Sequence, residues 1–197
     1  PGEVCLRREG GEGVPPAWMS EMMPVLMLIG GLAAGSLSLD DELPVSEHAW
    51  RTGGAASGSS TMFLEVNSRA RVEDLLRGII IQSGNDACIV VAEAIGGSEE
   101  AFADMMTDRA HELGLTSASF ANATGWPDPD HRISAIDLAR LARLLIEDHP
   151  EYYGIWAERE FTHTGIRQYN RNPPLGVFSG AAGLQTRHPA ETRSCLV

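Results

Sequence analysis

The most apolar stretch of the chain, residues 24–34, is the feature that most restricts its fold. It reads PVLMLIGGLAA and lies within residues 18–34, where apolar side chains recur with helical spacing. A helix that crosses a bilayer needs about 20 apolar residues, so this run is too short to span one. It predicts a helix at the core of a globular domain. Proline inside a helix costs about 3 kcal/mol, so we expect this helix to kink at Pro24 or to begin a few residues later.

Four more helices are predicted from apolar spacing and from residues that favour helix ends. The first covers residues 71–81. The second begins after Asn85, so that Asp86 lies in a first turn that favours negative charge. The other two have a serine at the N-cap and a glycine or proline at the end: Ser98 with Gly114, and Ser134 with Pro150. Helices therefore cluster in the middle of the chain.

Extended segments are predicted towards both ends. Residues 3–8 read as a short strand, residues 36–50 alternate like an extended segment, and residues 51–60 read as a Gly/Ser loop. Beyond the helices we expect a hairpin and two late strands, at residues 159–172, 180–188 and 194–197. This order indicates a single α+β domain over residues 1–197, with an antiparallel sheet closed by distant segments.

Composition excludes several classes of partner. The 197 residues carry a net charge of −12, so the chain offers no basic footprint for nucleic acid or for anionic lipid. The three cysteines, Cys5, Cys88 and Cys195, form no CxxC pair, and the six histidines show no metal-ligand spacing. We therefore expect no metal and no cofactor. Cys88 lies in the apolar run ACIVVA and is predicted to be a small buried residue.

Three long segments carry a specific likeness: LLRGIIIQSGNDACIVVAEAIGGSEEAFADMM, LGLTSASFANATGWPDPDHRISAIDLARLARLLIEDHPEYY and EFTHTGIRQYNRN. They resemble the penicillin-binding D-alanyl-D-alanine carboxypeptidases of low molecular mass. The resemblance implies the serine β-lactamase/transpeptidase-like fold, an antiparallel sheet flanked by helices. It also implies an exported protein, periplasmic or facing the cell wall, that removes the terminal D-alanine of the peptidoglycan pentapeptide through an acyl-serine. Penicillins and other β-lactams mimic that substrate.

The first motif of this family is Ser-x-x-Lys at the start of the core helix. Residues i and i+3 share a helix face, so the lysine can take the proton of the serine hydroxyl. Aligned on PPAWMSEMM, the nucleophile position is Trp18 and the base position is Glu21. Ser20 is an alternative hydroxyl, but it lies about 200° round the helix from Trp18 and has Met23 at i+3. The sequence therefore predicts that the acylation pair is lost.

The second and third motifs of the family are Ser-x-Asn and Lys-Thr-Gly. The second survives as Ser83-Gly84-Asn85, whose serine relays a proton in the family and whose asparagine holds the substrate backbone. At the third, the frame reads Gln185-Thr186-Arg187. Gln185 is a weaker partner for the substrate carboxylate than lysine. Arg187 stands where the family has glycine, so it either obstructs the cleft or supplies the missing charge.

Three functional readings follow from this pattern. The first, which the pattern favours, is a family domain that has lost the acylation chemistry; the other two are alternatives. The second is a non-catalytic module that binds the peptidoglycan stem peptide through Ser83, Asn85 and Thr186. The third is a fragment without function, because the final stretch departs from the family and the chain stops where the sheet of the family continues, without its last strand and terminal helix. On this reading the fold is incomplete at both termini, and the chain itself encodes no membrane anchor.

Overall fold

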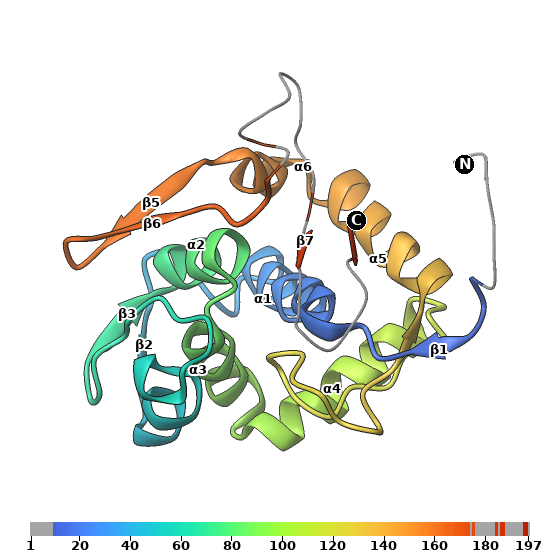
Figure 1. The fold of residues 1–197 in the computed structure, drawn as a ribbon, viewed down its shortest axis with the longest axis horizontal. Helices are drawn as coiled ribbons and strands as arrows, with labels where there is room; N and C mark the ends of the chain where they lie inside the picture. Colours follow the sequence, from blue (N-terminus) through green and yellow to red (C-terminus); the bar gives the residue numbers. More distant parts are fainter. Residues whose placement is uncertain (1–9, 174, 176–183, 185, 188–194, 197) are drawn as a thin grey trace.

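A helical cluster dominates the structure, a computed structural model that describes residues 10–173, 175, 184, 186–187 and 195–196. At positions 17–18, 186–187 and 195–196 it describes the backbone alone. Helix α1 lies in the middle and contacts α2, α3, α4 and α5, which surround it (Figure 1). The β5–β6 hairpin packs against α2. No helix of the described residues is long and apolar enough to cross a membrane.

The helices are, in chain order, η1 (Ala17–Glu21), α1 (Met22–Ala33), η2 (Ala49–Gly53), η3 (Ala55–Ser57), α2 (Val72–Gln82), α3 (Asn85–Gly96), α4 (Glu99–Glu112), α5 (Ala135–Asp148), α6 (Pro150–Tyr153) and η4 (Gly154–Ala157). The strands form antiparallel pairs: β1 (Gly13–Val14) with β4 (Ile133–Ser134), β2 (Glu42–Pro44) with β3 (Arg69–Arg71), β5 (Glu160–His163) with β6 (Ile166–Tyr169), and β7 (Thr186–Arg187) with β8 (Cys195–Leu196). Segments far apart in sequence thus close each of the pairs β1–β4 and β2–β3.

The apolar run forms the central helix, as predicted. Seven of the twelve residues of α1 are buried, among them Met22, Met23 and Leu28, and all seven lie in its first eight positions, where the other helices cover it. The α-helix begins at Met22, after the 3-10 turn of η1, so Pro24 lies in its first turn. Backbone N–H groups there have no intrahelical partner, so proline removes no bond. The expected later start of the helix is confirmed.

The helices bounded by local signals also form where they were predicted. The Ser98 hydroxyl accepts a hydrogen bond from the Ala101 amide at 3.1 Å and begins α4. The Ser134 hydroxyl accepts one from the Asp137 amide at 3.2 Å and begins α5. The predicted stop at Pro150 is confirmed, since α5 ends at Asp148. The predicted hairpin at residues 159–172 is confirmed as β5 and β6.

The prediction for residues 36–60 was wrong in part. Only β2 is a strand within the segment predicted as extended, and the expected Gly/Ser loop opens with η2 and η3, which are helical. The reason is tertiary, because η2 packs against α3. A Cβ at Gly53 would lie 2.4 Å from the Asp86 amide nitrogen, so this contact requires glycine. The strand predicted at residues 3–8 lies outside the described residues.

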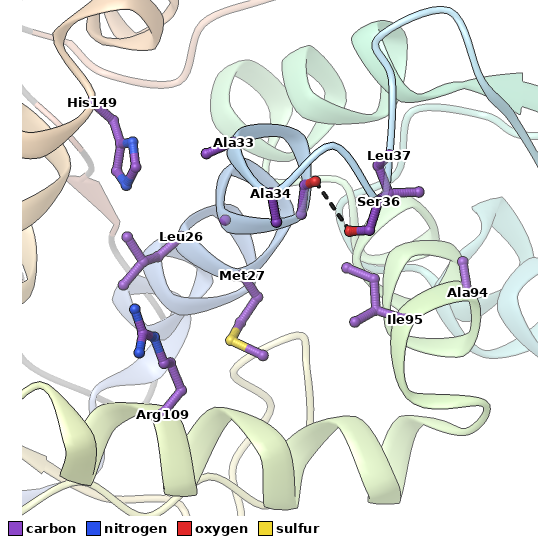
Figure 2. Close-up of a pocket in the computed structure, with 12 residues that line it drawn as sticks. Leu26, Met27, Ala33, Ala34, Ser36, Leu37, Ala94, Ile95, Arg109 and His149 are labelled. Atoms are coloured by element: carbon purple, nitrogen blue, oxygen red, sulfur yellow. Dashed lines mark hydrogen bonds between the residues drawn. The ribbon is translucent and has the colours of Figure 1, made fainter.

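A groove of about 640 Å³ runs beside the C-terminal half of α1. Figure 2 shows its wall of Leu26 and Met27 facing Ile95 of α3 and Arg109 of α4. None of the residues that line it belongs to the three family motifs.

Gly30 lines this groove and is a source of instability that alanine would remove. A Cβ at Gly30 would meet no atom within 4 Å, so no contact of the described structure requires glycine in the interior of α1. We expect Gly30→Ala to raise the free energy of unfolding by about 1 kcal/mol, measured by urea denaturation. Gly96→Ala is the matched control, because its Cβ would lie 2.7 Å from the Phe102 amide nitrogen and should destabilise. Equal effects of the two changes would contradict this account.

Candidate active site

The first motif falls on η1, directly before the central helix. Positions 18 and 21 are three residues apart, which is one full turn of a 3-10 helix, so they lie on one side of η1. The Glu21 side chain is buried, with 1% of its surface exposed. The alternative hydroxyl, Ser20, is buried as well. The side chain of Trp18 lies outside the described part of the structure.

Glu21 acts electrostatically on the first turns of α3. Burial raises the pKa of the Cys88 thiol well above its ordinary value, and the charges of Glu21, Asp86 and Glu99 raise it further. The thiol is therefore protonated at neutral pH and unreactive. Cys88 is buried, as predicted, and it forms no disulfide among the described residues. Glu21 directly precedes α1, and α1 packs against α3, the helix that follows the second motif.

The second motif forms the tight turn between α2 and α3. Ser83 caps α2 in the left-handed region, with φ 54°, and Asn85 is the first residue of α3. Non-glycine residues take up this conformation rarely, and strained residues of this kind cluster at functional sites. The Asn85 amide donates to the Ser60 carbonyl at 2.9 Å. The predicted hinge at Ser83-Gly84-Asn85 is thus confirmed.

Asn85 carries an unmet hydrogen-bonding capacity. Its side chain is fully buried, and neither its Nδ2 nor its Oδ1 has a hydrogen-bond partner among the residues that the structure describes. A buried polar group left in this state costs about 1–3 kcal/mol. A side-chain amide can donate from its NH₂ group and accept at its carbonyl oxygen, so it matches the C=O and N–H of a peptide ligand.

The Asp86 carboxylate fixes the segment that borders this turn. It accepts hydrogen bonds from the Thr61 hydroxyl at 2.6 Å, from the Met62 amide at 2.9 Å and from the Leu64 amide at 3.0 Å. A further bond comes from the Ala87 amide at 3.0 Å, at the start of α3. The sequence predicts Asp86 in a first helical turn, but it does not predict the partners Thr61, Met62 and Leu64, which lie 22 to 25 residues earlier.

Arg171 brings a positive charge to the same place, and sequence analysis missed it. Its Nη1 donates to the Ser60 hydroxyl at 2.6 Å, and its backbone amide donates to the Ile81 carbonyl at 3.2 Å. Gln168 of β6 donates from Nε2 to the Met62 carbonyl at 3.1 Å. The only sequence signal was the segment QYNRN, whose spacing says nothing about its partners.

For the third motif, the structure describes the backbone of Thr186 and Arg187. Thr186 and Arg187 form β7, which pairs with β8 and lies against η1. The first and third motifs therefore adjoin, although some 165 residues separate them in sequence. Gln185 and the side chains of Thr186 and Arg187 lie outside the described part of the structure.

No metal centre is present among the described residues, where no three His, Cys, Asp or Glu side chains gather. The described histidines make separate contacts. His111 Nε2 is 2.9 Å from the Ala118 carbonyl, and His163 lies 3.5 Å from Asp74.

The sequence model of the D-alanyl-D-alanine carboxypeptidase family matches residues 1–197. The chain belongs to this family. It is 41% identical over 172 residues to the D-alanyl-D-alanine carboxypeptidase DacC of Escherichia coli, covering 87% of this chain and 43% of the relative. It is 35% identical over 199 residues to DacF of Bacillus subtilis, covering 99% of this chain and 50% of the relative.

The solved structures of penicillin-binding proteins share the fold of this carboxypeptidase-family chain. Penicillin-binding protein 5 of Haemophilus influenzae superposes with a TM-score of 0.92 at 33% identity, covering 99% of this chain and 56% of that one. The penicillin-binding, transpeptidase-like fold expected from the sequence is confirmed. The chain spans about half the length of the curated relatives that it matches.

Proposed function

We propose that this chain is a non-acylating member of the carboxypeptidase family. In this role it recognises the D-alanyl-D-alanine end of peptidoglycan stem peptides without forming an acyl-serine, on the periplasmic or cell-wall side of the membrane. The observation that carries the proposal is the pair Trp18 and Glu21 at the nucleophile and base positions. Indole has no nucleophilic atom for acyl transfer, and a carboxylate at position 21 has no hydroxyl one turn earlier to activate.

The geometry of η1 supports this reading. Its 3-10 turn stacks positions 18 and 21 on one side, where a serine and a lysine would meet in an active relative. Glu21 also takes the place of the lysine that, in the family, accepts the proton of the serine hydroxyl, so the base is lost together with the nucleophile.

Recognition rests on the residues that survive. The buried amide of Asn85 offers a donor and an acceptor to a peptide backbone, and Ser83 adjoins it. Arg171 provides a cation next to this turn. We assign Gln185, Thr186 and Arg187 to the terminal carboxylate of the ligand, because β7 lies against η1. Arginine binds carboxylates well through paired N–H donors.

Labelling with a fluorescent penicillin tests the missing acylation. We expect no covalent band on a denaturing gel from the unaltered, folded chain. The combined variant Trp18→Ser, Glu21→Lys, Gln185→Lys and Arg187→Gly should give a band, because it restores the three motifs. Trp18→Ala with the other three changes is the matched control and should stay unlabelled. A band from the unaltered chain would overturn the proposal, and peptide mapping would then locate the nucleophile.

Calorimetric titration tests recognition separately. The unaltered chain should bind Nα,Nε-diacetyl-L-lysyl-D-alanyl-D-alanine without releasing D-alanine. Asn85→Ala should weaken that binding about tenfold, since a hydrogen bond inside a dry site contributes about 1.4 kcal/mol. A folded chain that binds no stem peptide would reject the recognition role while leaving the loss of acylation intact.

A further inference from the structure

Phe63 has a backbone conformation that its side chain opposes. Its φ is 64°, in the left-handed region, where a bulky residue is a genuine outlier. Glycine, asparagine and aspartate are the residues that usually occupy such positions. Phe63 is also 39% exposed, whereas its neighbours Met62 and Leu64 are buried. The chain therefore bears strain to hold an aromatic ring at the surface.

The surrounding hydrogen bonds impose this conformation. The amides of Met62 and Leu64, on either side of Phe63, both donate to the Asp86 carboxylate. The Phe63 amide itself donates to the Thr61 hydroxyl at 3.0 Å. The amides of three successive residues thus donate hydrogen bonds to side chains. Phe63 cannot leave its strained conformation without breaking one of these bonds.

The segment held in this way borders the second motif. The Met62 amide nitrogen lies 3.3 Å from the position that a Cβ on Gly84 would occupy. The Ser60 carbonyl accepts the Asn85 amide bond. Phe63 is therefore one residue away from a backbone contact with the Ser83-Gly84-Asn85 turn. A single exposed apolar residue is ordinary on a protein surface, but strain that exposes one beside a binding turn points to a function.

We propose that Phe63 is a ligand-contacting residue beside this turn, whose ring covers the aliphatic part of the stem peptide on the amino side of D-alanyl-D-alanine. This assignment rests on the proposed recognition of stem peptides. The reasoning is that an aromatic face gives a large apolar contact at little entropic cost, since it has only two side-chain torsions. The rigid hydrogen bonds around Phe63 preorganise the ring for that contact.

Phe63→Gly tests the proposal, because the two possible roles of the ring predict opposite signs. A ligand-contacting ring held under strain predicts a higher melting temperature and about tenfold weaker binding of diacetyl-L-lysyl-D-alanyl-D-alanine. If the ring serves only packing, Phe63→Gly should lower the melting temperature, and the folded protein should bind the peptide with unchanged affinity. Val66→Ala is the matched control, since Val66 is exposed on the same segment at an ordinary φ and should leave both quantities unchanged.

A shorter ligand separates this proposal from the proposed function. Acetyl-D-alanyl-D-alanine lacks the lysyl side chain, so Phe63→Gly should leave its affinity unchanged while weakening the longer peptide. Equal weakening of both ligands, or of neither, would overturn the role given to Phe63 and leave stem-peptide recognition in place. Failure of the unaltered chain to bind either peptide would instead overturn recognition itself, and the role of Phe63 with it.

Discussion

Replacing Asp86 by asparagine is expected to lower the free energy of unfolding by about 3 kcal/mol or more. The carboxylate is fully buried and accepts bonds from one hydroxyl and three amides at 2.6–3.0 Å. An asparagine side chain has a single oxygen, and its NH₂ group would face N–H donors that it cannot satisfy. Urea denaturation followed by circular dichroism measures the loss.

Asp104→Asn is the matched control for this change. Asp104 lies exposed on α4. Surface substitutions of this kind usually raise or lower the free energy of unfolding by less than about 0.5 kcal/mol. If both variants unfold at the same urea concentration, the Asp86 bonds contribute nothing and the segment before them is held by other means.

Acidification below pH 6.5 is expected to destabilise the protein through His131. Its ring is buried against Phe120, with centroids 5.5 Å apart, and its Nδ1 accepts a bond from the Ala121 amide at 3.2 Å. Burial lowers the pKa of His131 from 6.5 to about 4, although the charge of Asp128 opposes the shift. The unfolded chain therefore binds a proton at higher pH than the folded chain does.

The direction of the pH effect on stability follows from this difference in proton binding between the folded and the unfolded chain. Stability from the neutral ring is complete above pH 6.5 and is lost progressively as the pH falls towards 4, by about 3 kcal/mol in total. Urea denaturation at pH 7.5 and at pH 4.5 measures most of this loss. His131→Gln should remove it from the pH dependence, whereas His48→Gln, at an exposed site, should retain it. A pH dependence that survives His131→Gln would assign the effect to other groups.

The parts of the fold that sequence predicts are those with local causes. The serine caps of α4 and α5 bond to amides three residues away, so the residues that begin these helices are visible in the sequence. Residues 49–53 show the limit of this approach. They were expected to be extended or a loop, yet they form η2, because packing on α3 outweighs weak local preference.

The residues of the candidate site likewise fall into those that the sequence predicts and those that it does not. Sequence placed the Ser83-Gly84-Asn85 turn correctly, because helices end and begin there. It did not find Arg171 or the partners of Asp86, since these bonds join segments whose separation carries no periodic signal. The positions of Trp18 and Glu21 on one turn follow from their spacing of three. Their roles remain predictions that the labelling experiment addresses.

The segment between η2 and Ser60 is anchored at both ends to the beginning of α3. Gly53 touches the beginning of α3, and the Ser60 carbonyl receives a bond from Asn85, also at the beginning of α3. Residues 55–58 between them are exposed. A protease that cuts after Ser57 should therefore leave two pieces that stay associated, because each new end remains anchored within a few residues of the cut. Continuity of the backbone at this place is dispensable for the fold once folding is complete.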